Sequence, residues 1–255
     1  RAESTMKRLM MSAATLALLA GPVAATDIGD MTEAERQTFR EEVRQYLLES
    51  PEVLMEAIAV LEQRQAAEEA AAQEVAVAEN EAAIFNSAFD HVGGNLDGDV
   101  VIVEFVDYRC SYCRRAHPEV NELVNTDGNI RFITKEFPIL GEQSVLASRF
   151  AIATRLALGG EAYEQVSDAL MAMRSDVTEL ALARLASDLD LDSEAIFAEI
   201  DNPIVQSTID SNRALGQRMG ITGTPSFVFG DQLVQGYVPL ANMQDIVEII
   251  RDTAG

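Results

Sequence analysis

The feature that most constrains the fold is a pair of cysteines, Cys110 and Cys113, which are the only two in the 255 residues. They follow an apolar stretch, Val100 to Val106, and open a predicted helix that reaches about Val124. Backbone N–H groups at a helix start, together with the helix dipole, stabilise a thiolate and lower its pKa. The Cys-x-x-Cys spacing therefore predicts one nucleophilic thiol and a second that resolves the mixed disulfide, which is the chemistry of thiol–disulfide exchange.

A structural role for this pair is disfavoured. A disulfide between Cys110 and Cys113 would close a very short loop, for which the stabilisation through loop entropy is smallest. A structural zinc site needs four ligands, but the chain has two Cys and two His, and only His117 is near the pair. We therefore expect no metal or other cofactor, and we expect His117 to pack or hydrogen-bond. A metal site and an inert pair are the alternatives.

The first residues follow the order of an export signal. Met6-Lys7-Arg8 is a short positive segment, residues 9–20 are apolar, and Val23-Ala24-Ala25 resembles a cleavage site. The apolar run is short for a membrane span. We expect residues 1–25 to be a cleavable signal peptide. An oxidising compartment and a single Cys-x-x-Cys suit an enzyme that handles the disulfides of other proteins.

The charge of the chain restricts its partners. The formal net charge is −23 at neutral pH. Such acidity disfavours nucleic acids and anionic membranes as partners.

Residues 26–90 are predicted to form an N-terminal helical segment. Thr32 and Glu35 form a capping-box pattern, and Ser50 before Pro51 marks a second helix start. Beyond Leu61 the composition changes to Ala, Glu and Gln, which favours a helix that buries little area by itself. We predict a stalk that associates with copies of itself; packing on the catalytic domain is the alternative. Apolar residues recur at helical spacing at Phe39, Val43, Tyr46 and Leu47, and at Val53, Leu54, Ala57, Ile58 and Leu61.

Residues 91–255 are predicted to form one α/β domain. A turn-rich approach at residues 93–99 precedes the first clear strand, and Gly230-Asp231 indicates the turn of a hairpin. Strand, helix, strand, helical block, hairpin and helix is the order of a thioredoxin fold with a helical insertion. The predicted strands are 100–106, 130–134, 226–229 and 232–235; the helical insertion is about 141–216, with boundaries at 159–160, 174–176 and 202–203, and the last helix is about 240–251.

Two segments together resemble a known family. They are Val103–Arg115, with the sequence Val-Glu-Phe-Val-Asp-Tyr-Arg-Cys-Ser-Tyr-Cys-Arg-Arg, and Gly223–Val228, with the sequence Gly-Thr-Pro-Ser-Phe-Val. They are similar to the DsbA family of exported disulfide oxidoreductases, over about residues 91–255. The helical extension at about residues 32–85 is similar to the ScsC-like branch, the suppressor-of-copper-sensitivity proteins.

The resemblance implies roles for the cysteines and for a distant proline. Cys110 matches the exposed nucleophile and Cys113 the buried resolving thiol. Pro225 matches a cis-proline that faces the cysteines, and the backbone of Thr224 before it would pair with an extended substrate segment. An ordinary trans turn proline is the alternative. Between the cysteines, Tyr112 is expected to contact substrate and to make the protein a less extreme oxidant than members that have His there.

Glu104 is an acid within an apolar strand, and burial of such a group is costly unless it is paired or protonated. The resemblance implies that it assists proton transfer near the resolving cysteine. Lys135, at the end of the next strand, is a candidate partner for it. The alternative places Glu104 at a solvent-facing strand edge and makes Lys135 an ordinary surface charge.

The resulting expectation is a periplasmic thiol–disulfide oxidoreductase that acts on exported proteins and is reset by a membrane redox partner. A homo-oligomer, a trimer by resemblance, would favour disulfide isomerase activity, because isomerases benefit from several sites around a shared cleft. A monomer would favour oxidase or reductase activity. A Cu(I)-handling protein that uses the same two thiolates is an alternative of another class, and an inert spacer is a third.

Overall fold

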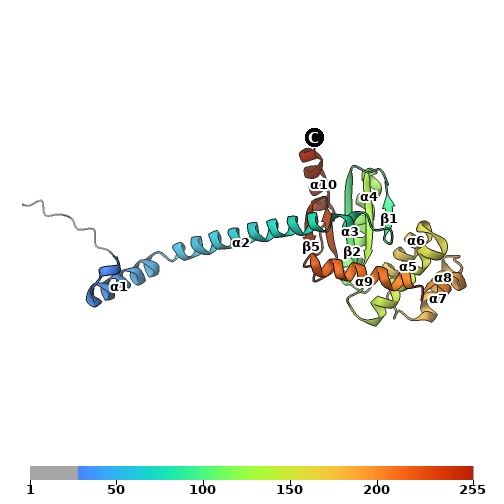
Figure 1. Ribbon diagram of the computed structural model, residues 1–255, viewed down its shortest axis with the longest axis horizontal. Coiled ribbons are helices and arrows are strands. Elements are labelled where there is room, and N and C mark those ends of the chain that lie inside the picture. The colour runs from blue at the N-terminus through green and yellow to red at the C-terminus, as the bar shows by residue number, and fades with distance from the viewer. Residues whose placement is uncertain (1–27, 255) are drawn as a thin grey trace, which may run out of the picture. The chain divides into compact units, whose positions relative to one another are not determined.

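The computed structural model describes residues 28–254 and divides the chain into two compact units, residues 1–64 and 65–255 (Figure 1). The signal peptide predicted for residues 1–25 lies outside the described residues. Within residues 28–254, every helix is too short or too polar to cross a bilayer.

The first unit is helical and keeps its apolar side chains accessible. It contains η1 (Ile28–Asp30), α1 (Glu33–Glu49) and the first part of α2 (Glu52–Glu79). The predicted capping box begins α1, because Thr32 Oγ1 accepts from Glu35 N at 3.3 Å and Glu35 Oε2 accepts from Thr32 N at 2.8 Å. α1 has no buried residue. The exposed large apolar side chains of this unit are Phe39, Val43, Tyr46, Leu48, Leu54, Met55, Ile58, Val60 and Leu61.

The second unit is built on a five-stranded sheet with the order β1-β3-β2-β4-β5. β2 is central, parallel to β3 and antiparallel to β4, and its near-continuous apolar sequence agrees with burial on both faces. In this register Glu104 is opposite Thr134 on one side and Phe227 on the other. The strands are β1 (His91–Gly94), β2 (Val100–Val106), β3 (Ile130–Glu136), β4 (Ser226–Phe229) and β5 (Gln232–Gln235).

β1 corrects the sequence interpretation, which took residues 93–99 as a turn-rich approach. Gly93 and Gly94 pair with β3 in an antiparallel ladder, at the edge of the sheet. Val92 is the one β-branched residue among the four and two of the others are glycines, so the pattern did not indicate a strand. Gly94 has φ +64° and a Cβ there would lie 2.5 Å from the Ile130 carbonyl oxygen, which explains the glycine.

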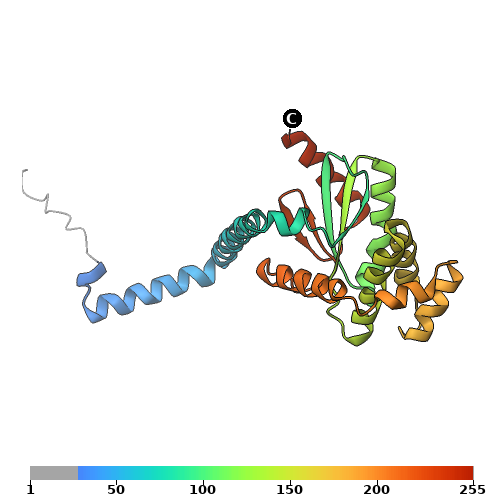
Figure 2. The same ribbon diagram turned by 45° about the vertical axis from the view of Figure 1, so that its right-hand side comes forward.

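Helices cover both faces of the sheet (Figure 2). α4 (Ser111–Asp127) and α10 (Leu240–Ala254) pack on one face, where Ile102 contacts the cluster that includes Val120 and Met243. α3 (Glu81–Phe85) and α9 (Pro203–Arg218) pack on the other, with Ile84 among the buried residues around Val103. Alternate residues of β2 therefore serve two separate cores.

The predicted helical insertion is present and has its own buried cluster. Breaks occur at Gly159, after Ala172 and before Pro203, near the predicted boundaries. A further break between Asp188 and Ser193 was not predicted. The helices of the insertion are α5 (Glu142–Leu158), α6 (Gly160–Ala172), α7 (Glu179–Asp188) and α8 (Ser193–Glu199).

The last part of the predicted stalk belongs to the second unit. Val77 at the end of α2 and Ile84 in α3 are buried in its core. The Asn80 side-chain oxygen accepts from Arg218 Nε at 2.7 Å. These contacts join residues 65–90 to the second unit, whose thioredoxin-type domain is predicted to begin at residue 91.

Candidate active site

The two cysteines lie at the junction between β2 and α4. Cys110 is the N-cap of α4, with an extended backbone, and Cys113 is in the first helical turn. The backbone N–H of Cys110 donates to the Asp107 carbonyl at 3.0 Å. This turn presents the sulfur of Cys110 beside the start of the helix, where N–H groups lack helical partners.

The Asp107 carboxylate fixes the turn. It is fully buried and accepts hydrogen bonds from the backbone N–H groups of Arg109, Ile139 and Leu140 at 2.8 to 3.0 Å. It therefore joins the cysteine turn to the loop that follows β3. Sequence analysis did not single out Asp107, although an acid at a strand end just before Cys-x-x-Cys was a usable signal.

Cys110 has the more acidic of the two thiols. A hydrogen bond with the Cys113 thiol lowers the pKa of Cys110, and further hydrogen bonds from Thr224 and from the backbone N–H groups of Cys113 and Tyr112 act in the same direction. Burial opposes them, and the resulting pKa is about 5. At neutral pH this sulfur is a thiolate and hence a nucleophile.

Cys113 is fully buried behind it. Burial raises the pKa of Cys113 far above its ordinary value, and the hydrogen bond to Cys110 and the charge of Glu104 raise it further. Cys113 is consequently a thiol at neutral pH. Any reaction that forms or breaks a bond between the two sulfurs must therefore move a proton at this buried position.

The loop before β4 completes the site. The Thr224–Pro225 peptide bond is cis, as predicted, and the sulfur of Cys110 lies 3.1 Å from the Thr224 carbonyl oxygen, to which the thiol form donates. Cys110 is 7 % exposed, so the nucleophile is less exposed than predicted. Tyr112 is 57 % exposed next to it. The structure thus brings Cys110, Tyr112, Thr224 and Pro225 together from segments more than a hundred residues apart.

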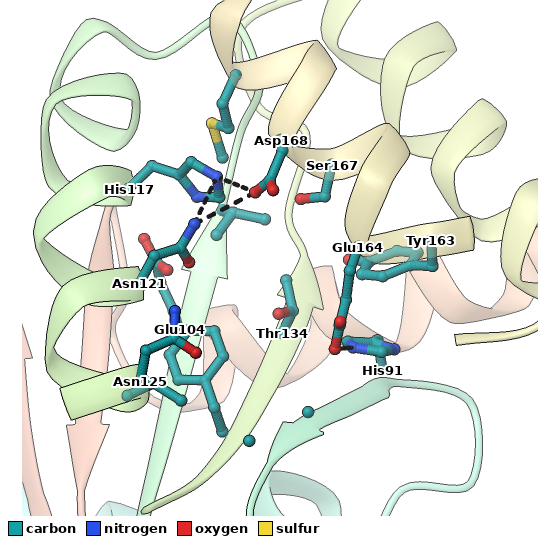
Figure 3. Close-up of a pocket in the computed structure, with 16 residues that line it drawn as sticks. His91, Glu104, His117, Asn121, Asn125, Thr134, Tyr163, Glu164, Ser167 and Asp168 are labelled. Atoms are coloured by element: carbon teal, nitrogen blue, oxygen red, sulfur yellow. Dashed lines mark hydrogen bonds and ion pairs between the residues drawn. The ribbon is translucent and has the colours of Figure 1, made fainter. Parts of the chain in front are cut away.

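Glu104 lines a cavity of about 200 Å³ (Figure 3). It is 2 % exposed, and among the described residues its Oε1 has no hydrogen-bond partner. Burial, with a smaller contribution from the charge of Cys110, raises its pKa to about 8. Glu104 is therefore mostly protonated at neutral pH, next to a thiol whose proton must move.

The cavity is lined by polar side chains of five elements, β1, β2, β3, α4 and α6. His117 and Asn121 project from α4, and Asp168 comes from α6; His117 Nε2 lies 2.6 Å from Asp168 Oδ1, and Asn121 donates to the same oxygen at 3.2 Å (Figure 3). His91 of β1 makes a second pair with Glu164 of α6 at 3.0 Å. His117 is hydrogen-bonded, as predicted. The contributions of α6 were not predicted, because no local pattern relates that helix to the cysteines.

The predicted pairing of Lys135 with Glu104 is wrong. Lys135 is opposite Phe105 in the register, so its side chain points to the face of the sheet away from Glu104. There its fully buried ammonium pairs with Asp90 at 2.5 Å and donates to the Ala83 carbonyl at 2.8 Å. Burial lowers the pKa of Lys135, and the charge of Asp90 opposes this. Lys135 therefore holds the segment before β1 and is not next to the cysteines.

A second buried acid was missed by sequence analysis. Glu136 accepts hydrogen bonds from the hydroxyls of Tyr108 and Tyr163, both at 2.7 Å. Burial raises its pKa to about 7. The signal that identified Glu104, an acid in an apolar strand, did not apply here, because Glu136 lies beyond the predicted strand 130–134 and follows Lys135.

The described residues contain no group of three or more His, Cys, Asp or Glu side chains arranged to hold a metal ion. Instead, the geometry combines a thiolate, a buried thiol beside it and an acid that is protonated near neutral pH. This arrangement can exchange disulfides with an extended chain that reaches Cys110.

Comparison with known families agrees with this geometry. A model described as the DSBA-like thioredoxin domain matches residues 101–248. A second, described as the copper resistance protein ScsC N-terminal domain, matches residues 35–68.

Solved structures are similar in sequence and fold. A thioredoxin-like oxidoreductase from Silicibacter pomeroyi DSS-3 is 42 % identical, with 68 % of this chain and 98 % of that chain covered and a TM-score of 0.64. BcfH from Salmonella enterica Typhimurium is 28 % identical, with 84 % and 95 % covered and a TM-score of 0.70. Proteus mirabilis ScsC in a transitional conformation is 27 % identical, with 87 % and 97 % covered and a TM-score of 0.62.

Curated relatives match only in part. The Na(+)/H(+) antiporter NhaA 3 of Salinispora tropica is 28 % identical over 138 residues, which are 54 % of this chain and 21 % of the antiporter. This chain therefore spans about a fifth of the length of that relative. The DSBA-like match, in contrast, covers more than half of this chain. The protein belongs to the DsbA-like thioredoxin family and carries an ScsC-type N-terminal domain.

Proposed function

We propose that the protein is a periplasmic thiol–disulfide oxidoreductase that acts on exported proteins. The observation that carries this proposal is the Cys110 thiolate beside the cis Thr224–Pro225 bond, with the protonated Cys113 behind it. An inert thioredoxin fold would not need two thiols with pKa values shifted in opposite directions.

The exchange begins with the Cys110–Cys113 disulfide. A substrate thiolate attacks the sulfur of Cys110, a mixed disulfide forms, and Cys113 leaves as a thiolate that takes the proton of Glu104. A second substrate thiolate then attacks the substrate sulfur of the mixed disulfide, and Cys110 leaves as a thiolate. Two electrons pass from the substrate dithiol to the protein, and the reverse sequence reduces a substrate disulfide.

Substrate would lie along the loop before β4. The backbone of Thr224 pairs with an extended segment of the substrate, while Pro225 and the exposed Tyr112 contact its side chains. When the substrate occupies the site, the Thr224 carbonyl exchanges its contact with Cys110 for backbone contacts with substrate.

The apolar surface of the N-terminal unit favours disulfide isomerase activity over oxidase or reductase activity. The exposed side chains of Phe39, Val43 and Leu54 line an apolar groove of the first unit, which suits association with other copies of the same unit. A homo-oligomer, a trimer by resemblance, holds several cysteine pairs around a shared cleft. A monomer would instead act as an oxidase or reductase.

Periplasmic location rests on the signal-like first residues and on a relative. The related structure from Salmonella enterica serovar Typhimurium, 27 % identical, is described as a periplasmic thioredoxin-like protein. In that compartment a membrane redox partner would restore the oxidation state of the cysteines after each cycle.

Handling of Cu(I) through the two thiolates is less well supported. Binding would require Cys113 to lose its proton at a fully buried position where its pKa is strongly raised. A buried thiol with a raised pKa suits the resolving role that we propose for Cys113.

Refolding of scrambled ribonuclease tests the proposal. The full mature chain is compared with residues 65–255 and with Cys110→Ser. The shorter chain begins at Gln65 because a start at His91 would remove Val77 and Ile84 from the core. We expect the full chain to isomerise, residues 65–255 to keep reductase activity toward insulin but lose isomerisation, and C110S to lose both.

Light scattering gives the mass of each form. Equal refolding by both chains, or a monomer mass for the full chain at micromolar concentration, would replace isomerase with oxidase or reductase. Absence of any thiol exchange by the wild-type chain would contradict the proposed function altogether.

A further inference from the structure

Three arginines gather beside the nucleophile of a strongly acidic protein. Arg109 precedes Cys110, Arg114 is in the first turns of α4, and Arg174 is in the loop after α6. Arg109 Nη1 donates to the Ser175 carbonyl at 3.0 Å, which holds that loop against the cysteine turn. Burial, and after it the charges of Arg109 and Arg174, lower the pKa of Arg114, so the guanidinium group of Arg114 lies close enough to the other two to be repelled by both.

Within residues 28–254, none of the three arginines makes an ion pair, although the whole chain has 42 acidic residues. Asp107 is the acid whose charge acts on Arg114, but both of its oxygens accept backbone N–H groups. Arg114 donates through Nε to the Tyr108 carbonyl at 2.7 Å, and its buried Nη2 has no partner among the described residues.

The state of Cys110 changes the charge balance of the cluster. In the reduced protein the Cys110 thiolate is an anion whose charge acts on Arg114. In the disulfide form that negative charge is absent, so the positive charge of Arg114, close to those of Arg109 and Arg174, lacks this counter-charge when a substrate thiolate approaches Cys110. A guanidinium group binds carboxylate with particular geometric fit, through paired N–H donors.

We propose that Arg109, Arg114 and Arg174 form a carboxylate-binding subsite that selects substrate segments with an acidic residue next to the reacting cysteine. This inference rests on the proposed thiol–disulfide exchange and specifies its substrate class. The net charge of −23 repels an acidic partner at long range, but salt screens that repulsion beyond about 10 Å. The selection therefore acts at contact and concerns the residues flanking the cysteine.

The alternative is that the cluster only stabilises the Cys110 thiolate. Substrate selectivity distinguishes a carboxylate-binding subsite from thiolate stabilisation. Thiolate stabilisation changes the rate toward every substrate by one factor, whereas a carboxylate subsite changes the ratio between acidic and basic substrates.

The test uses the oxidised full chain and three cysteine peptides that differ only in Asp, Asn or Lys beside the cysteine. Rates of mixed-disulfide formation are measured by acid quench, per mole of peptide thiolate. Arg174→Gln is the main variant, because Arg174 is exposed and its removal leaves the hydrogen bonds of Arg109 and Arg114 in place. Arg109→Gln is the second variant. Arg184→Gln, an exposed arginine on α7, is the matched control.

We expect the Asp peptide to react about two- to tenfold faster than the Lys peptide, and this ratio to fall about two- to fivefold in R174Q but not in R184Q. Added salt should reduce the ratio for the wild type more than for R174Q. The pKa of Cys110, measured in the reduced protein by thiolate absorbance, shows how much of any rate change comes from thiolate stabilisation and not from carboxylate binding.

Equal rates for the three peptides with the wild type would overturn the inference while leaving the exchange function intact. A uniform change of all three rates in R174Q, in proportion to the shift of the Cys110 pKa, would also overturn it. If no peptide reacts with the wild type, the proposed function fails and the subsite fails with it.

Discussion

The two units of the chain differ in which side chains they expose and which they bury. In the first unit α1 has no buried residue, and Phe39 and Val43 are accessible. In the second unit the titratable side chains of Glu104, Lys135 and Asp90 are buried. An exposed apolar surface is stabilised by a partner, whereas buried charges are tolerated only with a specific internal arrangement. The first unit therefore has the surface on which the proposed association depends, and the second has the buried groups on which the proposed exchange depends.

The largest effect on the free energy of unfolding is expected when the buried ion pair of the second unit is removed. Asp90→Asn leaves the Lys135 ammonium, which is fully buried, without its counter-charge. Loss of one partner of such a pair destabilises by about 3–5 kcal/mol. Chemical denaturation of residues 65–255 measures this, and Glu164→Gln, which weakens the exposed end of the His91 pair, is the control with a small effect. A loss below about 1 kcal/mol would show that water reaches Lys135.

The second prediction concerns Glu104 and pH. Its pKa of about 8 in the folded protein is above its ordinary value, so the folded state holds a proton that the unfolded state releases between about pH 4.5 and 8. This contribution stabilises the folded state fully at low pH, declines as pH rises and levels off above about pH 8. Glu104→Gln should flatten this decline in stability with pH. In the reducing direction it should also slow the attack of Cys113 on the mixed disulfide by about tenfold or more at neutral pH.

The difference in free energy of unfolding between reduced wild type and reduced E104Q across pH 5 to 9 measures the slope, because the Cys110 thiolate, whose pKa is about 5, contributes to both proteins with the opposite sign. Stopped-flow exchange measures the rate. Glu136, whose pKa is about 7, contributes in the same direction, and E136Q therefore serves as the comparison. A rate unchanged in E104Q, with a flattened stability profile, would confine Glu104 to a structural role.

The smallest effect on stability, but a clear effect on assembly, is expected in the first unit. Val43→Glu places a charge within the apolar stripe of α1, at a site 41 % exposed. The melting temperature of the catalytic unit should change little, while the molar mass by light scattering should fall. Arg36→Glu, on the same helix, is the charge control. An unchanged mass would mean that the stripe is covered by something other than a second copy.

Much of this comparison was predictable from sequence. The capping box at Thr32, the apolar spacing of α1 and the Cys-x-x-Cys at a strand end are local patterns, and each is present in the structure. The cis bond at Pro225 and the burial of Cys113 were predictable through resemblance. Partners set by tertiary contact were not. Register alone places Lys135 and Glu104 on opposite faces, and no local signal relates α6 to the cavity at Glu104. A four-residue edge strand with two glycines has too little side-chain information to be recognised.

The hydrogen bonds of Asp107 have a mechanical consequence. One carboxylate holds the backbone of Arg109, which precedes the nucleophile, and that of Ile139 and Leu140, whose side chains are 38 % and 53 % exposed. The two loops therefore behave as one stiff piece. A protein that binds at Ile139 and Leu140 would therefore also shift the turn that carries Cys110. Binding away from the sulfur would in this way change the orientation of the Cys110 thiolate.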